Sequence, residues 1–163
     1  LNEFKRTKHK SSVIDKVLVD LNASCINKQE AIQHIVDMLQ MNERTENPNC
    51  LENDFWQRET VYSTGMGYGF AIPHCKTAHI LGNSISVLRL NTPIDWNSID
   101  GKPVTIVIGM IIQDIEESSN VHMQIFSKLA RSIVHEDFRK QLKSFDRPEQ
   151  IVAYLQEKLE LKP

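Results

Sequence analysis

Residues 63–74 have the composition and spacing that suit binding of a charged group. They read STGMGYGFAIPH, and three of the chain's six glycines stand at alternate positions: Gly65, Gly67 and Gly69. Glycine tolerates positive φ and close backbone approach, so such a segment can turn its N–H groups toward an anion. The hydroxyls of Ser63 and Thr64 would add donors. One interpretation is a segment that cradles a phosphoryl group, and the other is a glycine-rich turn without chemistry.

His74 ends this segment and is the first candidate for a reacting group. A neutral imidazole, with an ordinary pKa of about 6.5, offers a ring-nitrogen lone pair. Pro73 fixes the backbone just before it, which helps to aim the ring. The pattern is not a dinucleotide-binding fingerprint, because GMGYGF lacks the third glycine at the required offset. It is not a Walker loop either, because no GK[ST] follows.

Three further residues are candidates. We expect His122 in the first turn of a helix, where a histidine is more often a half-buried polar group or a cap. Arg58, taken alone, is typical of a solvated charge. Cys75 beside His74 resembles a catalytic cysteine–histidine pair. Neighbours on an extended chain point to opposite sides, however, so we expect Cys75 to pack in the core.

The remaining histidines and the cysteines predict no metal site. His9, His34, His79 and His135 are assigned to surface or packing roles. The pair His135–Glu136 lacks the second histidine of a zinc-protease helix, and the three cysteines have no metal-ligand spacing. A metal-dependent hydrolase built on His74 and His122 lacks a third ligand. We therefore expect no cofactor and no metal.

Composition limits the class of protein. The chain has 163 residues, 40% of them hydrophobic and 25% charged, which is typical of one globular domain. A net charge of -2 gives no reason to expect nucleic acid or an anionic membrane as partner. No apolar run approaches the ~20 residues of a membrane helix. The odd cysteine count suits a reducing compartment, so we expect a cytoplasmic protein.

Helices and strands must alternate to position these residues. We expect helices in residues 26–42, from the end of the polar stretch 43–50 to about Tyr62, and in 118–134, 135–145 and 147–159. Strands are expected in 84–90 and 103–112, while 11–23 fits a short helix or a strand. Predicted helix starts are Asn27, Ser119 or Asn120, and Pro148. The alternation predicts an α/β fold, a central sheet covered by helices on both faces.

Residues 1–12 are expected to be a linker or leader, and residues 13–163 the domain. The leader holds a basic cluster, for which a nucleic-acid arm is a less favoured interpretation. The cluster comprises Lys5, Arg6, Lys8, His9 and Lys10. Because the chain begins with leucine, we expect it to be either part of a longer multidomain chain or a processed form.

The segment RETVYSTGMGYGFAIPHCK resembles the active-site signature of a known family. This family is the enzyme IIA domains of the fructose–mannitol class (type 2) of the bacterial sugar phosphotransferase system, and HMQIFSKLARSIV resembles its second block. The resemblance extends from about Val13 to Leu159. It implies a mixed, mainly parallel sheet between helical layers. Gln57 departs from the glutamate that is frequent at its position, and Tyr68 and Cys75 occupy variable positions.

The resemblance also implies roles for three residues. His74 would take a phosphoryl group from the phosphorylated histidine carrier protein, Arg58 would steady the phosphate, and His122 would be the second active-site histidine. Backbone groups at Gly65 and Gly67, with the hydroxyls of residues 63 and 64, would close around the phosphate oxygens. The donor is itself a phosphohistidine, so the transfer requires neither metal nor nucleotide.

Two functions of different classes remain open. The first is a relay that passes phosphate to a sugar-specific IIB domain during sugar uptake. The second is a regulatory domain, fused to a transcriptional activator or acting in a nitrogen-type system, in which histidine phosphorylation is the signal. The sequence identifies neither the sugar nor the oligomeric state. Neighbouring domains would discriminate: membrane spans indicate transport, and a helix-turn-helix indicates transcription.

Overall fold

A mixed six-stranded sheet forms the centre of the molecule. A computed structural model describes residues 12–116 and 118–161. The strands run in the order β1-β5-β6-β3-β2, and β4 also pairs with β6. The bounds are β1 Ile14–Ala23, β2 Gly65–Gly67, β3 Phe70–Ala71, β4 His74–Thr77, β5 Ser84–Ile94 and β6 Val104–Gln113.

Parallel pairing predominates in this sheet. Strand β1 is parallel to β5, and both β3 and β4 are parallel to β6. The pairs β2–β3 and β5–β6 are antiparallel. Strand β6 is buried along nearly its whole length, as expected for a central strand covered on both faces. The predicted mixed, mainly parallel α/β sheet is therefore confirmed.

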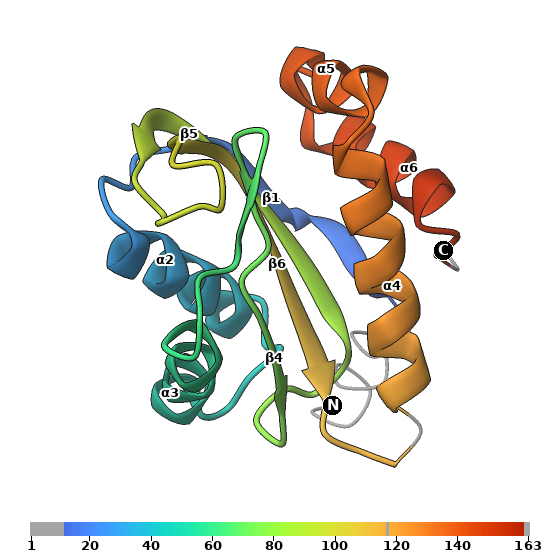
Figure 1. The fold of residues 1–163 in the computed structure, drawn as a ribbon. Helices are drawn as coiled ribbons and strands as arrows, with labels where there is room; N and C mark the ends of the chain where they lie inside the picture. Colours follow the sequence, from blue (N-terminus) through green and yellow to red (C-terminus); the bar gives the residue numbers. More distant parts are fainter. Residues whose placement is uncertain (1–11, 117, 162–163) are drawn as a thin grey trace.

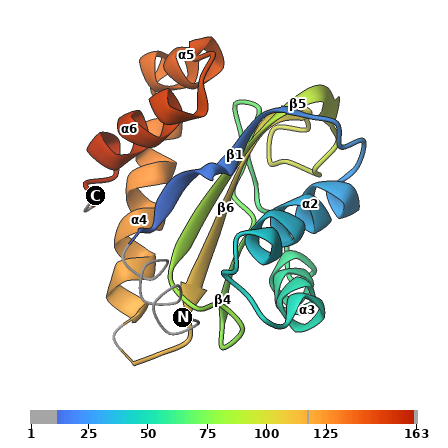
Figure 2. The ribbon, with the colours of Figure 1, turned by 180° about the vertical axis from the view of Figure 1, so that it is seen from behind.

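Helices cover both faces of the sheet (Figure 1; Figure 2, from behind). Helices α2 (Lys28–Met41) and α3 (Pro48–Glu59) lie on one face. Helices α4 (Ser118–Ile133), α5 (Glu136–Ser144) and α6 (Pro148–Lys158) lie on the other. Each layer has its own apolar core. Within residues 12–116 and 118–161, no helix has both the length and the apolar character that crossing a bilayer requires.

Two predicted helix starts are confirmed. Asn27 is the N-cap of α2, and its Oδ1 accepts a hydrogen bond of 2.8 Å from the N–H of Glu30. This bond satisfies an amide that has no partner within the helix. Pro148 is the first residue of α6, a position where the missing N–H has no consequence.

Residues 11–23, for which the sequence fits either a helix or a strand, contain strand β1. Leu18 and Val19 are buried, whereas Val17 is 45% exposed, and residues 14–23 are extended. Pairing with β5 decides the conformation here, because the segment supplies the edge strand of the sheet. The predicted leader lies almost wholly in residues 1–11, outside the described residues, and stays a prediction.

Two predicted helix boundaries are wrong. Helix α3 ends at Glu59 rather than near Tyr62, and the hydroxyl of Thr60 donates to the carbonyl of Trp56 over 2.8 Å at this end. Helix α4 begins at Ser118, so the expected caps, residues 119 and 120, lie inside the helix. His122 is consequently in the second turn and not in the first.

A break between β3 and β4 sets the position of His74. Both short strands pair with β6, but Ile72 and Pro73 between them leave the ladder. Proline has no N–H to contribute, although its carbonyl accepts from the N–H of Met110 over 3.0 Å. Pairing resumes with His74 opposite Met110. The histidine thus begins a strand in the middle of the molecule, between α3 and α4.

Candidate active site

The imidazole of His74 is held at both ring nitrogens. Nδ1 lies 2.8 Å from the backbone carbonyl oxygen of Ile72, and Nε2 lies 3.2 Å from Nε of Arg58. A carbonyl oxygen only accepts, so Nδ1 carries the ring proton. Nε2 is then unprotonated, and its lone pair accepts from the arginine. These contacts define a neutral imidazole whose Nε2 carries the lone pair that a nucleophile needs.

The environment of His74 favours this neutral form. The residue is only 8% exposed, and burial is the main cause that lowers the pKa of His74 below its usual value. The positive charges of Arg58 and His122 act in the same direction, while the hydrogen bond to Ile72 and the charge of Glu59 oppose it. A neutral imidazole near pH 7 retains the lone pair that nucleophilic attack needs.

Arg58 reaches His74 from the last turn of α3. Its Nη1 donates to the carbonyl of Tyr62 over 2.9 Å, and the guanidinium lies 4.3 Å from the centre of the Tyr62 ring. These contacts fix the side chain while leaving other N–H donors of its planar fork for a ligand. The fold thus brings Arg58 beside His74, although the two residues are 16 positions apart in the chain.

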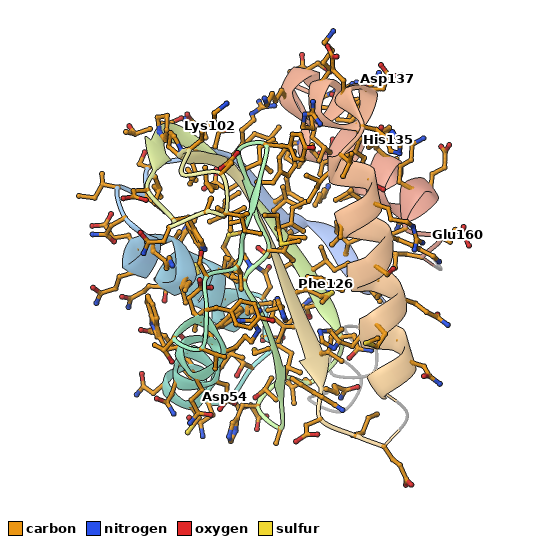
Figure 3. All side chains as sticks on the ribbon, viewed as in Figure 1. Asp54, Lys102, Phe126, His135, Asp137 and Glu160 are labelled. Carbon is orange, nitrogen blue, oxygen red and sulfur yellow. The ribbon has the colours of Figure 1, made fainter. Side chains whose placement is uncertain are left out.

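His122 faces His74 from α4. The two ring centres are 5.5 Å apart, and Phe126, one turn further along α4, lies 4.9 Å from the ring of His74. Figure 3 shows Phe126 on the side of α4 that faces the sheet. Nε2 of His122 is buried without a hydrogen-bond partner among the described residues. Burial, followed by the charges of Lys76 and Arg58, lowers the pKa of His122.

A pocket of about 360 Å³ joins these groups. It was only partly anticipated from the sequence, because Asp54, Gln57 and Lys76 also line it. Lys76 could have been found from strand spacing, since residues two apart in β4 point to the same side as His74. With Arg58 it gives the pocket two permanent positive charges. The full lining is Asp54, Gln57, Arg58, His74, Cys75, Lys76 and His122.

The four residues expected to bind phosphate do not line the pocket at His74. These residues are Ser63, Thr64, Gly65 and Gly67. The hydroxyl and N–H of Thr64 both donate to Glu59, and the N–H of Gly65 donates to the hydroxyl of Ser63. Direct phosphate binding by these residues stays a prediction. In this structure their polar groups hold the backbone that leads to His74.

All three glycines of the segment have a visible structural cause. A Cβ on Gly65 would overlap Oγ of Ser98 and lie 2.8 Å from its Cα, so only glycine fits between β2 and that loop. Gly67, Tyr68 and Gly69 follow with φ of 87°, 59° and 82°. Such a left-handed run makes the tight turn from β2 to β3. The glycines therefore build a hairpin close to the site.

Cys75 packs away from the imidazole of His74, as predicted. Its side chain belongs to the core on the α2–α3 face, whereas His74 meets Phe126 of α4. Burial raises the pKa of the Cys75 thiol far above its usual range, which keeps it protonated. Among the described residues, no group of three or more metal-ligating side chains could hold a metal ion.

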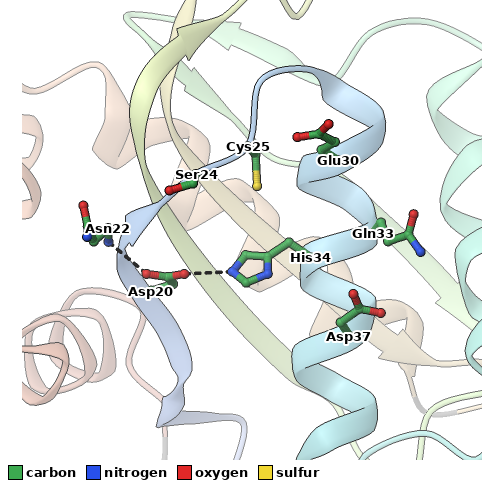
Figure 4. A pocket seen from close by; sticks show the side chains of 8 residues that line it. All are labelled: Asp20, Asn22, Ser24, Cys25, Glu30, Gln33, His34 and Asp37. Carbon is green, nitrogen blue, oxygen red and sulfur yellow. Dashed lines mark hydrogen bonds and ion pairs between the residues drawn. The ribbon is translucent and has the colours of Figure 1, made fainter.

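A second pocket, of about 400 Å³, lies between β1 and α2 (Figure 4). Its charged lining is acidic: Asp20, Glu30 and Asp37. His34 also lies there, and its Nε2 is 2.8 Å from a carboxylate oxygen of Asp20. Although this pocket is slightly larger, its charge repels a phosphoryl group. The cationic pocket at His74 is the one suited to phosphate.

The fold and the site together define a class of protein, a phosphoryl-transfer domain of α/β type. The family of the phosphoenolpyruvate-dependent sugar phosphotransferase system, EIIA 2, matches residues 12–158. The chain belongs to this family, whose members are phosphotransferase components. The resemblance inferred from the glycine segment is therefore confirmed.

Curated relatives agree with this assignment. Multiphosphoryl transfer protein 2 of Escherichia coli (strain K12) is 36% identical over 161 residues, which cover 99% of this chain and 19% of that protein. The PTS system fructose-specific EIIABC component of Bacillus subtilis (strain 168) is 30% identical over 132 residues, covering 81% of this chain and 21% of that protein. The chain thus spans about a fifth of the length of these relatives.

Solved structures share the fold. The nitrogen regulatory protein IIA-Ntr from Neisseria meningitidis superposes with a TM-score of 0.81 at 24% identity, covering 88% of this chain and 96% of that chain. Mannitol enzyme IIA of Escherichia coli, in complex with phosphorylated mannitol enzyme IIB, gives a TM-score of 0.68 at 17% identity. That alignment covers 90% of this chain and 96% of the other.

Proposed function

We propose that this domain is a phosphoryl relay in which Nε2 of His74 accepts a phosphoryl group from the phosphorylated histidine carrier protein. The observation that carries the proposal is the pair of contacts on His74: Nδ1–H donates to Ile72, so Nε2 is unprotonated, and its lone pair becomes available once the hydrogen bond from Arg58 opens. The pocket around this nitrogen holds Arg58 and Lys76, whose charges favour an incoming phosphoryl group.

The transfer balances without a further reactant. The phosphorus–nitrogen bond of the carrier's phosphohistidine breaks, and its electron pair stays on the carrier's nitrogen. Nε2 of His74 donates its lone pair to phosphorus and forms the new bond. The proton on Nδ1 stays in its hydrogen bond to Ile72 throughout. Positioning and electrostatic stabilisation account for most of the catalysis of such a transfer.

Arg58 and His122 would stabilise the phosphorylated state from opposite sides. Arg58 comes from α3 and His122 from α4, so a phosphoryl group bonded to Nε2 of His74 would lie between them. The planar guanidinium is suited to two phosphate oxygens at once. The buried, unpartnered Nε2 of His122 would gain its first partner from a third oxygen. A phosphoryl dianion would thus satisfy a polar atom that is otherwise buried alone.

The second step passes the group to a sugar-specific IIB domain. We propose that a cysteine thiolate on that domain attacks phosphorus, while the electron pair of the breaking bond returns to Nε2. Support comes from the complex of mannitol enzyme IIA with phosphorylated mannitol enzyme IIB, whose IIA component has the same fold. The multidomain relatives further suggest that these partners are joined in one longer chain.

In the regulatory alternative His74 is again the phosphate acceptor, but the phosphate is not passed on to a IIB domain. The fold of the nitrogen regulatory protein is close to this one, so fold does not separate the two functions. A relay must lose its phosphate quickly to a IIB domain. A signalling domain retains the phosphate and changes its affinity for another protein. Onward transfer is therefore the property that distinguishes them.

The experiment uses the domain with phosphoenolpyruvate, enzyme I and the histidine carrier protein. We expect an acid-labile phosphate on His74 alone, rapidly lost when a fructose- or mannitol-type IIB domain is added. His74→Ala should take up none, and His135→Ala, an exposed control, should behave as wild type. Label on His122, or label retained in His74→Ala, would disprove the acceptor assignment. Phosphate that stays on His74 in the presence of several IIB domains would favour regulation.

A further inference from the structure

Glu59 is a buried carboxylate, only 5% exposed, at the end of α3. Its two oxygens accept from one residue: Oε2 from the N–H of Thr64 over 2.9 Å, and Oε1 from the Thr64 hydroxyl over 2.6 Å. Nζ of Lys28 lies 3.0 Å from Oε2 and balances the charge. Two donors on one carboxylate fix both the position and the rotation of Thr64.

Thr64 in turn fixes the residue that orients His74. Its carbonyl accepts from the N–H of Ile72 over 3.0 Å, and the carbonyl of Ile72 accepts from Nδ1 of His74 over 2.8 Å. Pro73 restricts the backbone between Ile72 and His74. An unbroken series of hydrogen bonds therefore leads from Glu59 to the imidazole.

We propose that Glu59 is a positioning residue for His74. By holding Thr64, it fixes the carbonyl of Ile72, which keeps the ring proton on Nδ1 and leaves Nε2 free to react. Glu59 also ties down the helix end that carries Arg58, so one carboxylate aligns both groups. The inference rests on the proposed function in one respect, that Nε2 of His74 is the reacting atom.

Glu59→Gln tests the proposal with little change in volume. Glutamine has one acceptor oxygen and an NH₂ donor in place of two acceptor oxygens, so it cannot accept the two hydrogen bonds from Thr64 at separate atoms as Glu59 does. In ¹⁵N-labelled protein, we expect His74 to be almost wholly the Nδ1–H tautomer in wild type and a mixture of tautomers in Glu59→Gln. Phosphorylation from the carrier protein should slow about tenfold, since a misdirected nucleophile loses orientation.

Three variants separate positioning from simple stabilisation. Lys28→Met removes the ion pair but leaves both bonds between Glu59 and Thr64. It should lower the melting temperature while leaving the tautomer and the rate within about twofold of wild type. Thr64→Val loses the hydroxyl and should behave like Glu59→Gln, whereas Thr64→Ser retains it and should behave like wild type. Melting curves would verify that each variant is folded.

A wild-type tautomer population and rate in folded Glu59→Gln would overturn the proposal. So would a tautomer mixture in Lys28→Met as large as in Glu59→Gln, because the effect would then follow stability alone. The tautomer measurement uses unphosphorylated protein. If wild-type His74 accepted no phosphate, the proposed function would fail, but the tautomers of Glu59→Gln would still decide whether Glu59 positions the ring.

Discussion

Nε of Arg58 donates a hydrogen bond of 3.2 Å to Nε2 of His74. The arginine thereby occupies the lone pair that would attack phosphorus, so this bond must open before transfer. Once released, the same N–H is within reach of the oxygens of the arriving group. In the proposed transfer, Arg58 has two successive partners, the nucleophile first and the phosphate afterwards.

Replacing Arg58 should slow phosphorylation far more than it weakens the fold. A charge-assisted hydrogen bond to phosphate contributes about 1.5–3 kcal/mol, or about one to two decades in rate if it forms mainly in the transition state. Arg58→Ala should lose this amount, and Arg58→Lys should also be slow because it lacks the planar fork. Rapid-quench phosphorylation would measure both. Unchanged phosphorylation kinetics in Arg58→Ala would mean that Arg58 is only a solvated charge without a role in the transfer.

Phosphorylation of His74 should raise the pKa of His122. Burial and the nearby charges of Lys76 and Arg58 lower this pKa in the unphosphorylated protein, and a phosphoryl dianion would favour protonation. NMR titrations with and without phosphate on His74 would show the shift. His122→Ala should accept phosphate but pass it on slowly. Identical titrations in the two states would mean that the histidines do not share a phosphate site.

Stability should fall as the solution becomes mildly acidic. Burial lowers the pKa of both His74 and His122 below the reference value of 6.5, so the unfolded chain binds more protons than the native protein in this range. The free energy of unfolding should be constant above about pH 7 and decrease as the pH falls through about 6.5.

Urea unfolding at pH 8, 7, 6 and 5.5 would measure this dependence. The double variant His74→Gln, His122→Gln should show a smaller loss between pH 7 and 5.5, while His135→Gln, exposed at the start of α5, should keep the wild-type slope. An equal slope in the double variant would assign the pH dependence to other groups.

Gly65→Ala should destabilise the domain by about 1–3 kcal/mol, the usual effect of overpacking. The added Cβ would meet Oγ and Cα of Ser98, and the backbone contact cannot be relieved by a side-chain rotation. Gly101→Ala is a comparison in which the strain comes from the backbone alone: Gly101 has a φ of 71°, whereas Gly65 has no positive φ, and nothing lies within 4 Å of the added Cβ at Gly101. Thermal unfolding should give the larger loss for Gly65→Ala. Equal losses would show that the contact with Ser98 relaxes freely.

The sequence by itself determined the local elements and the family. Strand β6 follows from its apolar run, α2 from its cap at Asn27, and α6 from Pro148. The glycine segment with its terminal histidine is sufficient to identify the family. These features depend on neighbours along the chain, and sequence patterns predict such short-range features best. Helix boundaries are predicted less well: α3 ends earlier than its pattern predicts, and α4 begins before its expected caps.

Only the tertiary structure decided what surrounds His74. The proximity of Arg58, His122 and Phe126 depends on how α3 and α4 pack against opposite faces of the sheet. The assignment of the proton to Nδ1 depends on a carbonyl that Glu59 holds through Thr64. The glycines, expected at the phosphate, instead form a hairpin against Ser98. Such contacts join residues far apart in the chain, so their geometry is set by packing of the whole domain and not by local sequence.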